Sequence, residues 1–474
     1  MKIKINDLGP VRNAEFKLNK LNILVGDNNA GKTYITYSIY ELLKQRIESF
    51  AHFWRSRVIE ILKYNIDYFE AKNRVSDNIT IDFRIDEYNV DFNNQRGKRQ
   101  EIQKTNDLSN RKRSVAWFVS DLFNDSNKDI LTDKTNISLE AEIEDILIPT
   151  NESQSQLRIK TVDDIIHCII DVKSLAKKTA LRDSLAQSYL MITNILQPQL
   201  LIQDVNIFTA ERLGISIFYK ELDAARNNLI QELQAHLNGN QEQNTSSFLR
   251  RTSAFYARPI KDNIDYTRLI ENNSILKANI DNTYILEIFS LLIGGTYVKA
   301  ANEEIRYFSS DLNNPINIPL HLTSSSVRAL SDLFFYVKHL AKKGDMLMID
   351  EPESHLTLEK QRVMARLIAA IINQDVSIWI TTHSDFLLRE INNLILLNNE
   401  FPEKEGFLKN HTEDYTIKDK LKYTEVSLFN LSAGILTTDK TTKDGFSDSF
   451  LDIALVKSAQ ITAELQYYQN NETE

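Results

Sequence analysis

The stretch LNILVGDNNAGKT, residues 21–33, decides the fold because an apolar run leads directly into a phosphate-binding pattern. Gly26, Gly31, Lys32 and Thr33 fit the spacing G-x-x-x-x-G-K-S/T. Glycines in such a loop let backbone N–H groups converge on phosphates at the start of a helix. The residues after Lys32 carry apolar side chains at helical spacing, so the pattern lies between a strand and an amphipathic helix. The sequence therefore predicts a nucleotide site.

Each part of this loop has an expected role in binding ATP and Mg²⁺. Lys32 would place a positive charge on the β and γ oxygens, and the Thr33 hydroxyl would face the metal ion. The residues expected to bind the nucleotide here are Gly26, Asn28, Asn29, Ala30, Gly31, Lys32 and Thr33.

Composition places the chain among globular proteins. Its 474 residues exceed one ordinary core, which predicts two or three structural units. The net charge of -9 argues against a protein that coats nucleic acid over its whole surface. The single cysteine, Cys168, has isoleucine neighbours and is expected to be a buried structural thiol. Neither a signal segment nor a membrane span is recognisable, so we expect a cytoplasmic protein without membrane contact.

Two local basic stretches could still contact nucleic acid. The stretch from Arg96 to Arg113 lacks aromatic residues and is interpreted as a solvated loop. The stretch from Phe248 to Lys261 mixes aromatic and basic residues, so it is the better candidate for a phosphate backbone. Its basic residues are Arg250, Arg251, Arg258 and Lys261.

The hydrophobic pattern predicts the following elements. Three strands precede the phosphate loop, and residues 78–92 alternate as antiparallel strands do. Residues 96–160 are expected to be loops, residues 161–197 helical, and residues 205–215 a strand entering a turn. Helices are expected up to about residue 293, followed by short strands at 296–299, 303–308 and 316–320.

The most informative region alternates strands and helices. A strand at 345–350, a helix at about 357–374, a strand at 376–383 and a helix from Asp385 indicate a parallel α/β sheet. Further on, YTEVSLFNL predicts a strand, and an amphipathic helix is expected from Ser447 to Tyr468.

Acidic residues follow the first of these strands in the sequence MLMIDEPE. Asp350, at the strand end, is placed to hold Mg²⁺ through water, and Glu351 can orient and polarise the attacking water. Helix-capping acids are the alternative interpretation. The upstream phosphate loop favours hydrolysis.

A histidine follows the next strand in the sequence ITTHSD. The imidazole of His383 could contact the γ-phosphate or hold Glu351 in place. A structural role is the usual alternative for a lone histidine. Its position after Asp350 and Glu351 in the chain favours the functional role.

The order of phosphate loop, D-E-P-E and T-H-S resembles the ABC-type ATPase heads of the SMC, RecF and OLD kind. More narrowly, it is similar to the stand-alone AAA-family ATPases of bacterial anti-phage and toxin-like systems, including the ATPase subunits of the Septu and PARIS systems. The resemblance covers residues 1–45, 205–215 and 293–398. It implies an α/β fold of ABC-type head architecture, with a mixed sheet, an antiparallel β subdomain, helical insertions and a small C-terminal α+β extension.

The resemblance also implies a homodimer that binds ATP between its two copies. The family's L-S-G-G-Q signature is absent, and LTSSSVRAL (322–330) occupies its place. Ser324, Ser325 and Ser326 could present hydroxyls to a γ-phosphate, with helix capping as the alternative. Arg212 in TAERLG could sense the nucleotide, with a structural salt bridge as the alternative.

These features suggest four regions along the chain. They are an N-terminal ATPase lobe (1–215), a helical insertion (216–292), a C-terminal ATPase lobe (293–398) and a C-terminal extension (399–474). The expected activity is slow, regulatory ATP hydrolysis that controls a separate effector, such as a nuclease or toxin, in an anti-phage system. The alternative is an ATPase that clamps duplex DNA in repair or recombination.

Overall fold

The computed structural model describes six long segments and several short strands. The long segments are residues 1–47, 202–218, 256–272, 280–300, 304–311 and 315–447, and the strands lie between residues 78 and 171. Within these segments no helix is both long and apolar enough to cross a membrane.

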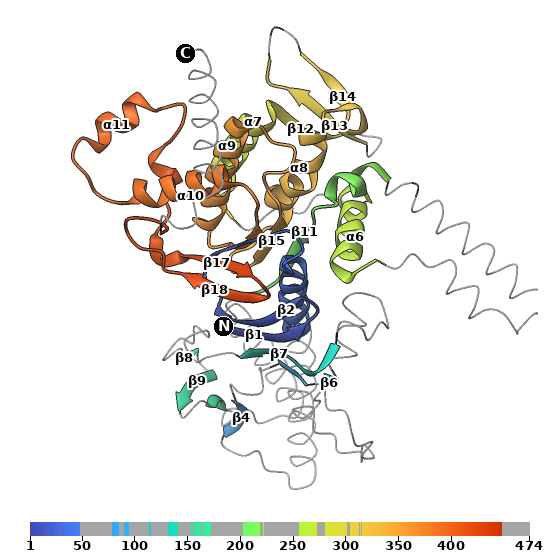
Figure 1. Cartoon of the computed structure of the whole chain (residues 1–474), viewed down its shortest axis with the longest axis vertical. Helices are drawn as coiled ribbons and strands as arrows, with labels where there is room; N and C mark the ends of the chain where they lie inside the picture. Colours follow the sequence, from blue (N-terminus) through green and yellow to red (C-terminus); the bar gives the residue numbers. More distant parts are fainter. Residues whose placement is uncertain are drawn as a thin grey trace, which may run out of the picture.

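An 11-stranded mixed sheet forms the centre of the molecule, in the order β11-β15-β16-β3-β17-β18-β2-β1-β7-β5-β6 (Figure 1). Its strands are β1 (Lys2–Leu8), β2 (Val11–Lys17), β3 (Leu21–Gly26), β5 (Val90–Asn93), β6 (Arg113–Ser114), β7 (Leu131–Glu140), β11 (Val205–Phe208), β15 (Met346–Asp350), β16 (Ser377–Thr381), β17 (Val426–Ser432) and β18 (Ile435–Asp439). Neighbours from β11 to β17 are parallel. The pairs β1–β2, β1–β7 and β5–β7 are antiparallel.

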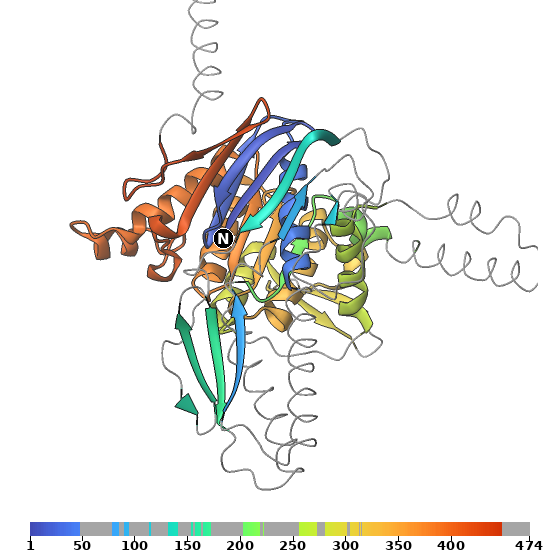
Figure 2. The same cartoon turned by 90° about the horizontal axis from the view of Figure 1, so that it is seen from below.

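Two smaller sheets are antiparallel. One has the order β4-β10-β9-β8 and the other the order β12-β13-β14, and Figure 2 shows β4, β10 and β9 side by side. Their strands are β4 (Asn78–Arg84), β8 (Ser153–Gln154), β9 (Leu157–Val162), β10 (Ile165–Asp171), β12 (Gly295–Lys299), β13 (Ile305–Ser309) and β14 (Asn317–Pro319). The predicted fold class, a mixed sheet with an antiparallel β subdomain and helices, is therefore confirmed.

Helices cover the parallel half of the large sheet (Figure 1). The labelled helices are α6 (Arg258–Asn272), α7 (Thr283–Ile293), α8 (Ser325–Phe335), α9 (Leu358–Ile372), α10 (Asp385–Asn398) and α11 (Lys404–Asn410). Short turns are η6 (Leu320–Leu322), the π-helical η7 (Tyr336–Leu340), η8 (Ile417–Asp419) and η9 (Tyr423–Glu425). A further helix begins at Lys32, directly after the phosphate loop.

The central strands are buried on both faces, as their continuous apolar sequences predict. In β15, Leu347 and Ile349 pack in a core with residues of α7, α8, α9 and α10. The alternate residues Met346 and Met348 join a second core, with residues of β1, β2 and the helix after Lys32. Because side chains alternate along a strand, one short apolar strand contributes to both cores.

The predicted strands and helices around the motifs are confirmed, whereas two predictions are wrong. In the region 96–160, expected to be loops, residues 131–140 form β7, which pairs along its length with β1, and the short strands β6, β8 and β9 also lie there in whole or in part. Residues 165–171, expected to be helical, form β10 between β4 and β9. In both segments strand pairing decides the structure, because β propensity depends on the neighbouring strands more than on local sequence. The helix expected from Ser447 to Tyr468 lies outside the described residues except for Ser447 itself.

Candidate nucleotide site

The sheet order brings the predicted motifs to one edge. β3 lies beside β16, and β16 lies beside β15, all three parallel. The phosphate loop, His383 and the Asp350–Glu351 pair therefore follow the carboxyl ends of three adjacent strands. In open α/β sheets ligands bind at this edge.

The phosphate loop has a backbone that requires glycine at two positions. Gly26 has φ 148° and Gly31 has φ 109°, both outside the range that side chains favour. A Cβ on Gly26 would collide with the carbonyl oxygen of Leu431, and one on Gly31 would lie 2.9 Å from Pro10 and Val11. The turn is thus packed between β17 and the β1–β2 connection.

The remaining loop residues lie at the surface. Asn28, Asn29 and Thr33 are exposed, and Asn29 has φ 63°. The Ala30 N–H donates to the carbonyl of Asp27 at 3.3 Å. A tight turn with exposed polar residues before a helix fits a phosphate group, which the helix N-terminus would bind through its N–H groups.

The ammonium group of Lys32 folds back onto the loop. Its Nζ donates to the carbonyl oxygens of Gly26 and Asp27, each at 2.8 Å. Burial lowers the pKa of Lys32, while the nearby carboxylates of Glu351, Asp27 and Asp350 oppose this shift. Lys32 therefore lies within electrostatic range of Glu351, the predicted catalytic acid, and of Asp350, the predicted metal ligand.

Asp350 is buried at the end of β15, and its carboxylate has one hydroxyl partner. The Thr381 hydroxyl donates to Oδ1 of Asp350 at 2.8 Å. Burial raises the pKa of Asp350 to about 6, partly offset by this hydrogen bond, and the charge of Glu211 raises it further. A metal ion bound here would favour the ionised form of Asp350. The carboxylate of Asp350 and the hydroxyl of Thr33, an exposed residue, are oxygen ligands of the kind that Mg²⁺ prefers.

Glu351 has a strained backbone. Its φ is 48°, a conformation that costs a residue other than glycine about 1 kcal/mol or more. The Glu351 N–H donates to the Thr381 carbonyl at 3.0 Å, and the Ser354 hydroxyl donates to Oε2 of Glu351 at 2.9 Å. These contacts hold the carboxylate in one orientation beside Asp350.

Arg212 contacts this strand end from the residues that follow β11. Its guanidinium donates to the carbonyl oxygens of Asp350 at 2.6 Å and of Glu351 at 2.7 Å. The side chain is 4% exposed. Burial lowers the pKa of Arg212, and the negative charges of the nearby acids partly oppose this shift. The structure therefore shows Arg212 bound to the backbone of the two acids. A role in sensing the nucleotide stays a prediction.

His383 is exposed directly after β16, and its backbone is fixed by Glu353. Oε1 of Glu353 accepts hydrogen bonds from the His383 N–H and from the Thr382 hydroxyl, both at 2.8 Å. The sequence interpretation did not include Glu353 among the site residues, although it is the last letter of D-E-P-E. Thr381 and Ser354, which bind the two acids, were missed because single hydroxyls carry no recognisable pattern.

The serine cluster lies at the start of α8. Ser324 is the N-cap, with its Oγ accepting from the Val327 N–H at 3.4 Å, and it lies 3.0 Å from the Ser326 hydroxyl. The capping role is therefore present. Contact of Ser324, Ser325 or Ser326 with a nucleotide stays a prediction.

The basic residues proposed for nucleic acid are only partly described. Arg250 and Arg251 lie outside the described residues. Arg258 donates to the buried carboxylate of Glu41 at 3.0 and 3.1 Å, and Lys261 is half-buried in α6. The guanidinium of Arg258 thus has a protein partner.

The family model described as the AAA ATPase domain matches residues 1–388. The chain belongs to the AAA ATPase domain family. No curated protein matches it.

Three solved structures are similar to this AAA ATPase over nearly its whole length. The Smc head domain derived from Pyrococcus furiosus, with an extended coiled coil and bound to the C-terminal domain of ScpA, is 12% identical, with TM-score 0.31 and 98% of each chain covered. An Smc head bound to the C-winged helix domain of ScpA is 11% identical, with TM-score 0.29 and coverage of 92% of this chain and 96% of that chain. The SMC head domain from Thermotoga maritima is 10% identical, with TM-score 0.30 and coverage of 93% and 98%.

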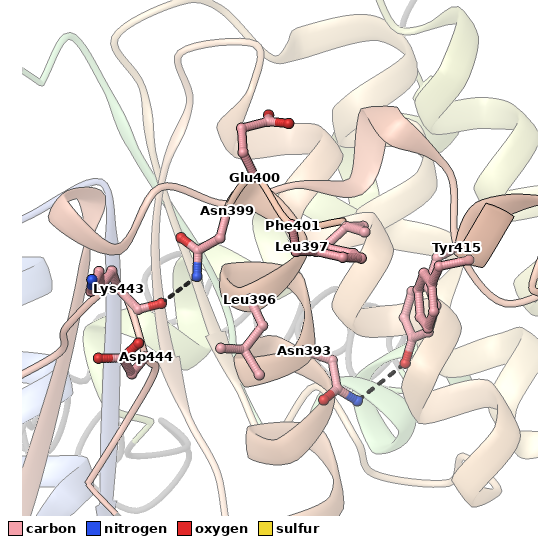
Figure 3. Close-up of a pocket in the computed structure, with 10 residues that line it drawn as sticks. Asn393, Leu396, Leu397, Asn399, Glu400, Phe401, Tyr415, Lys443 and Asp444 are labelled. Atoms are coloured by element: carbon pink, nitrogen blue, oxygen red, sulfur yellow. Dashed lines mark hydrogen bonds between the residues drawn. The ribbon is translucent and has the colours of Figure 1, made fainter. Parts of the chain in front are cut away.

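A separate open cavity lies between α10, α11 and the segment after β18 (Figure 3). Its volume is about 690 Å³, and its lining includes none of the predicted site residues of the ATPase. Asn393 donates to the Tyr415 hydroxyl at 3.2 Å, and Asn399 donates to the Lys443 carbonyl at 2.6 Å. Polar groups of the wall thus bind one another.

Proposed function

We propose that this AAA ATPase is an ATP-controlled switch, which dimerises around ATP and regulates a separate effector in a bacterial anti-phage or toxin-like module. The observation that carries the proposal is the position of Lys32, Asp350–Glu351 and His383 after three adjacent parallel strands. In such an arrangement the residues that bind the phosphates and the residues that activate water meet at one edge.

Each residue has a role in the proposed reaction. Lys32 would exchange its loop carbonyls for the β and γ oxygens of ATP, and Glu351 would orient the attacking water. The water passes a proton to the Glu351 carboxylate as it attacks the γ-phosphorus, the bond from phosphorus to the β–γ bridging oxygen breaks with its electron pair on ADP, and ADP and inorganic phosphate leave. His383 would contact the γ-phosphate from the neighbouring strand. Thr33 and Asp350 would hold Mg²⁺, which supplies positive charge to the phosphate oxygens.

The proposed dimer would complete each site with Ser324, Ser325 and Ser326 of the second copy. At the N-terminus of α8, hydroxyl and N–H groups are suited to an anion. The segment lacks the glycines of the usual signature, so we expect slower hydrolysis than in ATPases that have them. Slow hydrolysis suits a switch, because the ATP-bound state then persists.

In this proposal a separate effector protein carries out the final activity of the module. The chemistry of the described site acts on the phosphates of ATP, and the signal would reach the effector through closing and opening of the dimer. Binding of duplex DNA is the competing outcome. The hydrogen bonds from Arg258 to Glu41 reduce the basic surface available for it.

Glu351→Gln provides the test. The variant should lose phosphate release by a factor of about 100 or more, because the carboxylate that activates water is gone. It should still form an ATP-dependent dimer, measured by light scattering during size-exclusion chromatography. Hydrolysis at the wild-type rate would disprove the role of Glu351, and a monomer at saturating ATP would disprove the switch.

Affinity purification of the protein from cells then identifies what it binds. Tagged Glu351→Gln, expressed from its native locus with ATP present, should retain a stoichiometric effector that Lys32→Ala loses. Recovery of duplex DNA without a protein partner would favour the clamp.

A further inference from the structure

Glu353 connects two of the three strand ends at the nucleotide site. It follows β15 by three residues, whereas its carboxylate binds the residues that follow β16. Oε1 accepts from the His383 N–H and from the Thr382 hydroxyl, both at 2.8 Å. One oxygen atom therefore fixes the backbone of His383 relative to the strand of Asp350.

Thr382 extends the connection to the third strand. Its N–H donates to the carbonyl of Leu24 in β3 at 3.2 Å, and its Oγ1 accepts from the Ser384 N–H at 3.0 Å. Ser384 is in turn the N-cap of α10, accepting from the Leu387 N–H at 3.1 Å. The carboxylate of Glu353 thus lies at the centre of a continuous set of hydrogen bonds that includes all three strands.

The second oxygen of this carboxylate shares one property with a few other buried side-chain atoms of the described residues, such as Ser38 Oγ. Oε2 of Glu353 is buried and has no hydrogen-bond partner within the described residues. A buried polar atom without a partner costs about 1–3 kcal/mol, and such atoms are rare in folded proteins. A residue chosen for packing alone would avoid this cost, whereas a residue that positions a functional group can retain it.

We propose that Glu353 is a positioning residue, which holds His383 in the orientation needed to reach the γ-phosphate. The inference rests on the proposed function, because it assigns to His383 a contact with the nucleotide. Glu353 acts through the His383 backbone and does not itself touch the reacting atoms. Although its charge also lies near the buried guanidinium of Arg212, its role at His383 requires an acceptor oxygen rather than a negative charge, since the two groups it binds there are hydrogen-bond donors.

The need for an acceptor oxygen predicts different effects for two substitutions of Glu353. Glu353→Ala removes the acceptor and should lower kcat about 10- to 100-fold, the usual effect of losing a residue that orients a functional group. The KM for ATP should change little, because Lys32 and the loop are untouched. Glu353→Gln keeps an acceptor oxygen of the same reach and should restore most of kcat. Glu359→Ala is the matched control, because Glu359 is an exposed glutamate in the first turn of α9.

A double variant shows whether Glu353 acts through His383. When two residues act as one unit, their effects are not additive. Glu353→Ala combined with His383→Ala should therefore be no slower than His383→Ala alone. If the two losses in kcat multiply, or if Glu353→Gln is as slow as Glu353→Ala, the proposed positioning role is wrong.

Amide hydrogen exchange tests the contact between Glu353 and the residues after β16 in an experiment that does not depend on ATP hydrolysis. In the nucleotide-free full chain, Glu353→Ala should speed exchange in residues 382–384, and Glu359→Ala should not. Unchanged exchange would overturn the proposal, even if the chain proved to be an inactive ATPase. Absence of wild-type hydrolysis with the expected exchange pattern would instead overturn the proposed function. If Glu353→Ala does not fold, Thr382→Val takes the place of that variant in both measurements, since it removes one of the two hydrogen bonds to Glu353 and with it the acceptor for the Ser384 N–H.

Discussion

The guanidinium of Arg212 lies 2.6 Å from the carbonyl oxygen of Asp350, although 138 residues separate the two in sequence. The bond fixes the end of β15 from the side of β11, and a second bond to the Glu351 carbonyl extends the contact. Because the planar group has several donors in fixed directions, it can bind adjacent carbonyls together. Arg212 thus supports the backbone on which both acidic side chains are placed.

Replacement of Arg212 by lysine should destabilise the protein by about 2–4 kcal/mol. A lysine cannot reproduce the bonds to both carbonyls, and each buried acceptor left unpaired costs about 1–3 kcal/mol. Urea unfolding measures the change. Arg306→Lys is the matched control, because Arg306 binds Glu304 and Asn317 at a partly exposed site where water can replace it, and this change should cost less than about 1 kcal/mol. Equal decreases in the free energy of unfolding of the two variants would contradict the role of Arg212 as a buried donor to both carbonyls.

Lys32→Ala should weaken ATP binding about 10- to 100-fold. The ammonium group that would leave its two loop carbonyls for phosphate oxygens is removed, and a hydrogen bond to a charged group is worth about 1.5–3 kcal/mol. Isothermal titration calorimetry with Mg²⁺ and a non-hydrolysable ATP analogue measures the affinity. Lys44→Ala, near the other end of the same helix, should bind as the wild type does, because Lys44 pairs with Asp204.

Asp350→Asn should stabilise the metal-free protein at pH 7. Burial raises the pKa of Asp350 to about 6, so the folded state takes up a proton near pH 6 and the unfolded state only near pH 4. This group therefore makes the wild type more stable as pH falls from about 7 to 4, by up to about 3 kcal/mol. The asparagine variant lacks this dependence, keeps an acceptor for Thr381, and should lose Mg²⁺-dependent hydrolysis.

Thermal unfolding between pH 4 and 7 distinguishes the two proteins. Asp345 also has a pKa of about 6, raised mainly by burial, so the wild-type curve alone is not diagnostic. The difference between wild type and Asp350→Asn isolates Asp350. A difference that is constant across this pH range would contradict the assigned burial.

Gly26→Ala should destabilise the protein by about 2 kcal/mol or more and weaken nucleotide binding. The added Cβ would collide with the Leu431 carbonyl, and the φ of 148° is unfavourable for alanine. Gly214→Ala is the control, because it makes the same change from glycine to alanine at another position. Its Cβ would meet no atom within 4 Å, and its position in a helix predicts a gain of up to about 1 kcal/mol.

The sequence predicted the elements that carry the motifs because each combines a short apolar run with a polar end. β3, β15 and β16 have this form, and their parallel order follows from the helices between them. The strands β7 and β10 were missed although each pairs with a strand encoded far earlier, β1 for β7 and β4 for β10, and β10 also pairs with its chain neighbour β9. For β7 one of these partners is β1, which lies more than a hundred residues earlier in the chain.

The site was predictable in its residue types more than in its contacts. The spacing indicates Lys32, Asp350 and Glu351, whereas the backbone contact of Arg212 and the carboxylate bonds of Glu353 depend on tertiary structure. A single arginine or glutamate has no periodicity from which its partner could be found. Only the closeness of β15, β16 and β11 shows what these two side chains bind.

The pairing of β3 with β17 also has a consequence for the newly made chain. Leu21 pairs with Val426 and Gly26 with Leu431, so the strand that carries the phosphate loop has one neighbour encoded more than 390 residues later. Its other neighbour, β16, is also encoded late. During synthesis β3 and its phosphate loop therefore lack both neighbouring strands until most of the chain has been translated. Early nascent chains should rely on chaperones to protect this apolar segment.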